Sequence, residues 1–365
     1  MKRITLLKLA LIITILAAVP ATTRADCAGS SVTFRTEVVT YYETYYELPA
    51  EQNLNEEWAC NYETNNGRRY CRVRLYGVMH SPLYFVREGQ RPPQFPVIVY
   101  NHGSEEEFTA YTKACSIANY FVPKGYIVFV PFRRGHGDQL NSAKSTGVYI
   151  EDMLTDFDNR RPAHDTTCGD RQCYKAELLR EQAEEDVAAA FTYLSGRADT
   201  KKDRSLNLVS AVSGSSYGGA ITVLVNRLDL GQRAAVAFSP AAQNWGAVNF
   251  AYAAKRWVDA GNFTPLQDEL LKASQDAKAP AFYLQAKWDY DTRATIDLAY
   301  AHAYGGNDPT HGQRFMAAIF PYDKPGPDPL DPDQLDYQSV HVGFANSTDI
   351  WGAAVLDFIR TYGVK

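Results

Sequence analysis

Residues 208–219, Leu208-Val209-Ser210-Ala211-Val212-Ser213-Gly214-Ser215-Ser216-Tyr217-Gly218-Gly219, decide the fold. The first half alternates and is β-branched, as expected of a strand, and the second half consists mainly of small residues. Within it, Gly214-x-Ser216-x-Gly218 predicts a sharp turn from a strand into a helix. Such a turn forces a strained backbone on the serine, and glycine two positions to either side removes the Cβ atoms that would clash there. The apolar segment 220–226 that follows is a plausible buried helix.

This strand–turn–helix setting is what a nucleophile elbow requires. The elbow presents the serine hydroxyl at the end of a sheet. The first N–H groups of the following helix have no intrahelical partner and can bind an oxyanion formed on the serine. A lone Gly-x-Ser-x-Gly is also common in turns that only connect elements, so the assignment of Ser216 depends on its context.

A serine hydroxyl becomes a nucleophile when a base takes its proton, and that base is usually a histidine oriented by a carboxylate. Where an elbow of this kind carries the nucleophile, the chain order is serine, acid, histidine, and the last two residues lie on loops after later strands. Asp289 follows an expected strand over 281–285, and His341 follows the last expected strand, 314–320, after a Pro- and Asp-rich loop. The sequence therefore predicts the triad Ser216, Asp289 and His341.

Other residues compete for two of these roles. Asp291 is the alternative acid, although Asp289 lies nearer the end of its strand. The alternative bases are His102, His136, His302 and His311. For the oxyanion, we expect two backbone N–H donors, Tyr217 after the nucleophile and Ser104 on the loop after the strand 95–100.

Continuous apolar runs, typical of strands buried on both faces, occur at 95–100, 125–131, 234–238 and 281–285. Helical patterns separate them, and alternation of this kind predicts an α/β fold with a mostly parallel, doubly wound sheet and helices on both faces. The tyrosine-rich segments 32–48 and 70–85 predict antiparallel edge strands at its start. Further helices are expected over 175–194, through most of 241–277, and over 348–362.

The chain has 365 residues, which suits a single domain from 26 to 365 with no internal repeat or linker. Two lid-like insertions are expected near 141–174 and 241–280. The second contains five aromatic residues that can form core or line a pocket: Trp245, Phe250, Tyr252, Trp257 and Phe263.

Residues 1–25 are typical of a secretory signal peptide, because Lys2 and Arg3 precede a short apolar run. Lys8 interrupts that run, which disfavours a permanent membrane span, and an uncleaved N-terminal anchor is the alternative. No stable membrane span is expected after signal cleavage. All six cysteines follow the signal, and an oxidising compartment would pair them. By closeness in sequence and elimination, the expected pairs are Cys60–Cys71, Cys168–Cys173 and Cys27–Cys115. We therefore expect a secreted or periplasmic protein.

Composition argues against other classes of ligand. The formal net charge is -5 and there is no basic stripe, so nucleic acid is an unfavoured partner. The cysteines lack the paired spacing of a zinc site. An acidic loop could hold calcium, but its prolines and spacing do not match an EF-hand; its acidic residues are Asp328, Asp331, Asp333 and Asp336. The expected chemistry needs no metal and no organic cofactor.

The motifs together resemble the α/β-hydrolase superfamily, and within it the dienelactone hydrolase-like and prolyl-oligopeptidase-like group. They are Asn101-His102-Gly103, Arg134-Gly135-His136-Gly137, Gly214-x-Ser216-Tyr217-Gly218-Gly219, Asp289 and His341-x-Gly343-Phe344. The resemblance covers roughly residue 76 to the C-terminus and implies the same triad: Ser216 as nucleophile, Asp289 as acid and His341 as base. The chain departs from the family pattern in three ways. Dienelactone hydrolases have a cysteine where this chain has Ser216, and full prolyl oligopeptidases have a β-propeller before the catalytic domain. The glycine that usually precedes the acid loop is Ala286 here.

Three functions follow from these residues. The first is an exported serine hydrolase that cleaves a carboxylic ester through an acyl-enzyme on Ser216. The second is a prolyl-oligopeptidase-like serine peptidase, for which Glu105 to Glu107 could bind a substrate amino terminus. The third is a non-catalytic binding module, which the retained serine and histidine disfavour. The substrate is accordingly expected to be a small-molecule or peptide ester or amide.

Overall fold

The structure is a computed structural model, and its described residues are 34–48, 61–65, 68–104, 115–138, 143–146, 171–241, 245, 250–251, 256–257, 265–287, 289, 292–305, 314–322 and 337–365. Several sequence predictions lie outside these residues: the signal peptide, most of the first insertion, Glu105 to Glu107, Asp291, His311 and the four acidic residues of the candidate calcium loop.

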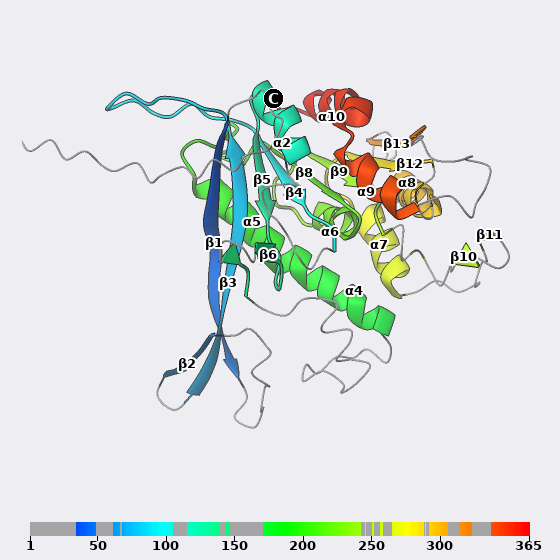
Figure 1. Cartoon of the computed structure of the whole chain (residues 1–365), viewed down its shortest axis with the longest axis horizontal. Coiled ribbons are helices and arrows are strands. Elements are labelled where there is room, and N and C mark those ends of the chain that lie inside the picture. Colours follow the sequence, from blue (N-terminus) through cyan, green and yellow to red (C-terminus); the bar gives the residue numbers. More distant parts are fainter. Residues whose placement is uncertain are drawn as a thin grey trace, which may run out of the picture.

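A nine-stranded sheet forms the centre of the part of the chain that the structure describes (Figure 1). The strand order is β1-β3-β5-β4-β8-β9-β12-β13, and β2 pairs with β3. The strands are β1 (Arg35–Leu48), β2 (Asn61–Asn65), β3 (Arg68–Ser81), β4 (Val97–Asn101), β5 (Ile127–Pro131), β8 (Ser210–Ser215), β9 (Ala234–Phe238), β12 (Ala281–Ala286) and β13 (Phe315–Phe320).

The strands from β5 to β13 along this order pair in parallel, whereas β1, β2 and β3 pair antiparallel. The mostly parallel, doubly wound sheet is thus confirmed, and so are antiparallel strands at its N-terminal edge. The architecture is the α/β-hydrolase fold that the resemblance implies. In Figure 1, β1 and β3 run well past the ends of the parallel strands, and β2 lies at their far end.

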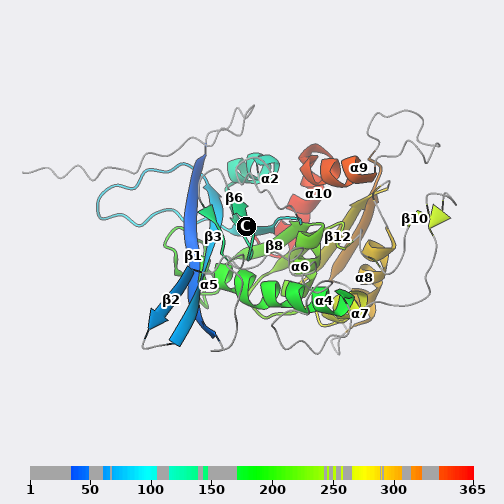
Figure 2. The ribbon, with the colours of Figure 1, turned by 60° about the horizontal axis from the view of Figure 1, so that its bottom comes forward.

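Helices cover both faces of the sheet. Figure 2 shows α2, α9 and α10 on one side and α4, α5, α7 and α8 on the other. The helices are α2 (Cys115–Phe121), the 3-10 turn η1 (Val122–Lys124), α4 (Arg171–Glu181), the π-helix η2 (Gln182–Val187), α5 (Ala188–Gly196), α6 (Tyr217–Asn226), α7 (Pro265–Gln275), α8 (Arg293–Tyr304), α9 (Tyr337–Asn346) and α10 (Thr348–Thr361).

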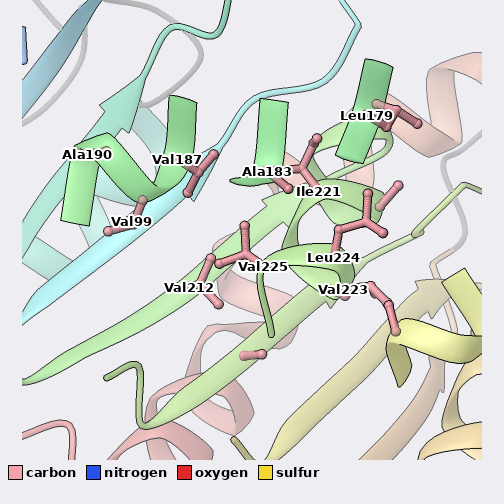
Figure 3. Close-up of a cluster of buried hydrophobic side chains, with 14 of the residues drawn as sticks. Val99, Leu179, Ala183, Val187, Ala190, Val212, Ile221, Val223, Leu224 and Val225 are labelled. Atoms are coloured by element: carbon pink, nitrogen blue, oxygen red, sulfur yellow. The ribbon is translucent and has the colours of Figure 1, made fainter. Parts of the chain in front are cut away.

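The apolar strands supply both cores because successive side chains point to opposite faces. Val97 and Val99 of β4 join the cluster under α4 to α8, while Ile98 and Tyr100 join the cluster under α2, α9 and α10. Figure 3 shows side chains of α4, η2, α5 and α6 packed over Val99 and Val212. All ten residues of α6 are buried, so the helix that follows the elbow is held on every side.

Three sequence predictions about elements need correction. The helix expected over 175–194 contains the π-helix η2, which widens one turn. The segment 241–277 is helical only from Pro265 among the described residues, because β10 (Phe250–Ala251) and β11 (Arg256–Trp257) pair as two short antiparallel strands. His341 lies on α9 rather than on a loop, since 337–346 coils as a helix that buries Val340 and Phe344.

Cys115 and Cys173 are both disulfide-bonded, and the described residues contain no free cysteine. The three pairings expected from the sequence stay predictions. None of the described helices is long and apolar enough to cross a membrane.

Candidate active site

Ser216 lies at a strained turn between β8 and α6. Its backbone has φ 59° and ψ -122°, a combination that side chains other than glycine rarely adopt. A Cβ on Gly214 would lie 2.7 Å from the carbonyl oxygen of Asn101, and one on Gly218 would lie 2.6 Å from the carbonyl carbon of Asn101. The two glycines are therefore required by close packing, as the Gly-x-Ser-x-Gly pattern predicts.

The end of β4 packs directly against this turn. Asn101 is fully buried, and its side-chain amide donates to the carbonyl oxygen of Ser213 at 3.3 Å and to the hydroxyl of Thr222 at 3.4 Å. Thr222 in turn donates to the carbonyl oxygen of Gly218 at 2.8 Å. These bonds join the last residue of β4 to β8 and to α6, on either side of the turn that carries Ser216.

Asp289 and His341 form a direct hydrogen bond. The Nδ1 of His341 lies 2.7 Å from Oδ1 of Asp289, and both side chains are buried. A carboxylate only accepts, so Nδ1 carries the proton and Nε2 is the nitrogen that can take a proton from a nucleophile. The acid and the base predicted from the sequence are thus brought together.

Backbone bonds tie Ser216 to the strands that carry this pair. The N–H of Ser216 donates to the carbonyl oxygen of Phe238 at 3.0 Å, and the next residue, Ser239, donates its hydroxyl to Oδ2 of Asp289 at 2.5 Å. β8, β9 and β12 are adjacent parallel strands, so their carboxyl ends lie at one edge of the sheet. The three predicted triad residues therefore lie at the same end of the sheet: a hydrogen bond joins His341 directly to Asp289, and the backbone of Ser216 is bonded to the residue before Ser239.

Ser239 is a site residue that the sequence reasoning missed. It is buried, has a positive φ of 45°, and occupies the carboxylate oxygen that His341 does not use. A donor at that oxygen limits rotation of the carboxyl group and keeps Oδ1 facing the histidine. The available signal was its position immediately after the strand next to the elbow strand.

The two expected oxyanion donors come from the two segments that pack together where Asn101 contacts the elbow. Tyr217 is the first residue of α6, so its N–H has no intrahelical acceptor. Ser104 lies three residues after β4 and is partly buried. The side chain of Tyr217 also accepts a hydrogen bond from the buried ammonium of Lys175, which lies over its ring at 4.2 Å from the centroid. Lys175 was not identified from the sequence.

The alternative histidines have other partners. His102 and His136 are buried with ring centroids 4.5 Å apart, and Nδ1 of His102 donates to the carbonyl oxygen of Gly103 at 2.9 Å. His302 is buried on α8, where its Nδ1 lies 3.2 Å from the hydroxyl of Tyr283. Trp245, a candidate pocket residue, belongs to the core and donates to Asp297 at 2.9 Å.

Neither a protein-family model nor a curated protein sequence matches this chain. Solved structures similar to it include an acylaminoacyl peptidase from Pyrococcus horikoshii, with 14% identity, a TM-score of 0.46, and coverage of 78% of this chain and 38% of that one. An esterase from Pyrococcus furiosus has 15% identity, a TM-score of 0.47 and coverage of 84% and 92%. An acetyl xylan esterase from Paenibacillus sp. R4 has 14% identity, a TM-score of 0.45 and coverage of 88% and 89%.

This chain thus spans less than half the length of the acylaminoacyl peptidase. The strand order and the elbow described above carry the assignment of the fold.

Proposed function

We propose that this protein is a serine hydrolase that cleaves a carboxylic ester through an acyl-enzyme on Ser216. The observation that carries the proposal is the 2.7 Å hydrogen bond between His341 and Asp289 at the edge of the sheet where Ser216 lies on its strained turn. A hydroxyl, an imidazole and a buried carboxylate in this arrangement can act as nucleophile, base and orienting acid.

In the first half of the reaction, the Oγ of Ser216 attacks the ester carbonyl carbon while Nε2 of His341 takes the hydroxyl proton. The carbonyl oxygen becomes an oxyanion, which the N–H groups of Tyr217 and Ser104 bind. Asp289 stabilises the imidazolium that forms. The bond from carbon to the alcohol oxygen then breaks, and the alcohol leaves with the proton from His341.

In the second half, His341 takes a proton from a water molecule, whose oxygen attacks the acyl carbon. The bond to Ser216 breaks, the serine regains the proton from His341, and the carboxylic acid leaves. The ester and one water molecule supply all the atoms that leave as the alcohol and the carboxylic acid, and Ser216 and His341 return to their starting protonation.

We assign an ester rather than a peptide as the substrate because nothing in the described site favours a peptide. The residues that could bind a substrate amino terminus, Glu105 to Glu107, lie outside the described residues. We also propose that the reaction takes place in the periplasm or outside the cell, which the N-terminal sequence supports. The substrate that we propose is an ester of a small molecule or of a peptide, and an amide is the alternative that the substrate panels test.

Labelling of the mature, oxidised protein with a fluorophosphonate, followed by peptide mapping, tests the proposal. Such reagents react readily only where a serine has both a base and an oxyanion site. We expect one label, on Ser216, and none on Ser216→Ala protein with an unchanged circular dichroism spectrum. A folded wild-type protein that takes no label would instead favour the non-catalytic binding module.

Substrate panels then distinguish the bond. Faster turnover of p-nitrophenyl esters than of aminoacyl-p-nitroanilides, lost in Ser216→Ala, supports the esterase. The reverse preference would assign a peptidase.

A further inference from the structure

Arg133 is a fully buried arginine that follows β5 and reaches the loop after β4. Its Nη1 donates to the carbonyl oxygen of His102 at 2.9 Å, and its Nη2 donates to the carbonyl oxygen of Gly103 at 3.0 Å. One planar guanidinium thus binds two successive carbonyl groups of the same loop. Its fork of donors has a fixed geometry, so the two peptide groups are held in a fixed relation to each other.

These carbonyl groups belong to the peptides that carry the N–H groups of Gly103 and Ser104. In a trans peptide the C=O and the N–H point in opposite directions. By drawing both carbonyl oxygens to one side, Arg133 therefore turns the N–H groups of Gly103 and Ser104 to the other side. Ser104 is the residue to which we assign the second oxyanion donor.

The guanidinium is itself held from the other side by the π-helix. Its Nε donates to Oε1 of Gln182 at 2.9 Å, and Gln182 is buried at the first position of η2. Four residues later, Asp186 accepts from the backbone N–H of Arg134 at 2.9 Å and from its Nε at 2.8 Å. The widened turn of η2 therefore presents two buried acceptors to two consecutive residues after β5, which fixes the loop that carries Arg133.

We infer that Arg133, held by Gln182, is a positioning residue of the oxyanion site: it acts on the reaction through the peptide groups of His102, Gly103 and Ser104. The inference rests on the proposed function and deepens it. Donation to a carbonyl oxygen also polarises its amide, so the N–H of the same peptide becomes a stronger donor to developing negative charge. Both effects favour the transition state, where the oxyanion exists, over the bound ester.

The test compares Arg133→Lys, Gln182→Leu and the double variant with wild type. Lysine keeps the charge but has no planar fork with which to bind two carbonyl groups and Gln182 together. Removing one oxyanion donor costs about 10²–10³ in kcat in a serine protease. For a donor that is misaligned rather than removed, we expect kcat to fall about 10- to 100-fold in Arg133→Lys, with KM nearly unchanged. Rates are expressed per site titrated with fluorophosphonate to completion, so unfolded protein does not count.

Two further readouts separate positioning from general stability. Affinity for a trifluoromethyl ketone, whose adduct with Ser216 carries an oxyanion, should fall by the same factor as kcat/KM. Gln182→Leu should have a smaller effect than Arg133→Lys and little additional effect in the double variant, because both act through one group. Arg197→Lys is the matched control. Arg197 forms an ion pair with Asp199 beside the start of β4, at the end of that strand far from the elbow. The substitution should leave kcat per titrated site unchanged.

The inference fails if Arg133→Lys keeps wild-type kcat and inhibitor affinity per titrated site, whatever its melting temperature. It also fails if Arg197→Lys loses as much kcat as Arg133→Lys does. If wild-type protein takes no label on Ser216, the proposed function fails first, and that outcome is seen before any variant is measured.

Discussion

The two halves of the candidate site are built in different ways. The nucleophile half is one continuous segment, β8 to α6. Backbone atoms of the segment itself and of the chain at the ends of β4 and β9 leave no room for a Cβ on Gly214, Gly218 or Gly219. The acid–base half is assembled from three separate segments, and hydrogen bonds from Ser239 to Asp289 and from His341 to Asp289 hold it together. The first half is fixed by steric exclusion and the second by polar contacts.

The two constraints differ in tolerance. Steric exclusion tolerates almost no change, because the atoms that a new Cβ would overlap belong to the backbone and cannot move aside without shifting the strands. A hydrogen bond can be replaced or lengthened at a cost of one to a few kcal/mol. Changes at the three glycines of the first half should therefore affect folding, and changes in the second half should affect mainly the rate of reaction.

Gly218→Ala is the strongest way to break this comparison. Its Cβ would overlap the backbone of Asn101 and His102, so we expect a loss of unfolding free energy of about 4 kcal/mol or more, or no folded protein. Urea denaturation followed by circular dichroism measures it. Gly196→Ala is the matched control: Gly196 is exposed at the end of α5 with no atom within 4 Å of an added Cβ, and the change should be within about 1 kcal/mol of neutral. If both variants are equally stable, steric exclusion does not define the elbow.

A pH experiment sharpens the comparison, because it separates the effect of pH on the free energy of unfolding from its effect on the catalytic base. His80 of β3 is fully buried beside Thr36, and burial lowers its pKa from 6.5 to about 4. The unfolded chain binds a proton below about pH 6.5 whereas the folded protein resists it until about pH 4. The free energy of unfolding should therefore fall by roughly 3 kcal/mol as the pH drops from 6.5 to 4.

His80→Gln removes this titration while keeping an amide that can bond to Thr36. Its unfolding free energy, measured by urea denaturation at several pH values, should lack the step that wild type has between pH 6.5 and 4. Its pH profile of kcat between pH 6 and 8 should match wild type, because the base is His341 and not His80. An unchanged step in the variant would contradict the role of His80.

Ser239→Ala is expected to have the smallest effect and bears only on the acid–base half. Hydrogen bonds to charged groups contribute about 1.5–3 kcal/mol, so we expect kcat to fall about 10- to 100-fold, with KM unchanged. Asp289→Asn gives the scale, because it places the histidine in the wrong tautomer and should cost about 10⁴-fold.

Steady-state kinetics on the best ester measure the effect of Ser239→Ala. Ser210→Ala controls for loss of a buried serine, since Ser210 is at the other end of β8 and its hydroxyl has no hydrogen-bond partner among the described residues. Equal kcat losses in the two serine variants would mean that Ser239 does not orient Asp289.

The same difference explains what the sequence could predict. The elbow is local, and it is therefore predicted by a pattern of five residues that contains Gly214, Ser216 and Gly218. The parallel strands are visible as continuous apolar runs because both of their faces are covered. Asp289 and His341 were predicted from their order along the chain and their position after strands, which depends on the fold rather than on local pattern.

Contacts between distant segments could not be predicted in this way. Ser239 lies 50 residues before Asp289, and Arg133 lies 49 residues before Gln182, so no periodicity connects them. His341 was expected on a loop because the Pro- and Asp-rich segment before it gives no clear signal for the start of α9. The strands β10 and β11 were missed because two-residue strands carry no alternation to recognise.

The chain order of the site also decides when the proposed triad can assemble on a newly made molecule. The ribosome adds about 5–20 residues per second, from the N-terminus onward. The elbow emerges first, and α9 follows only after all of β9, β12 and β13 have been made. A nascent chain therefore carries its serine without a base, and the hydroxyl stays inert until α9 docks beside Asp289.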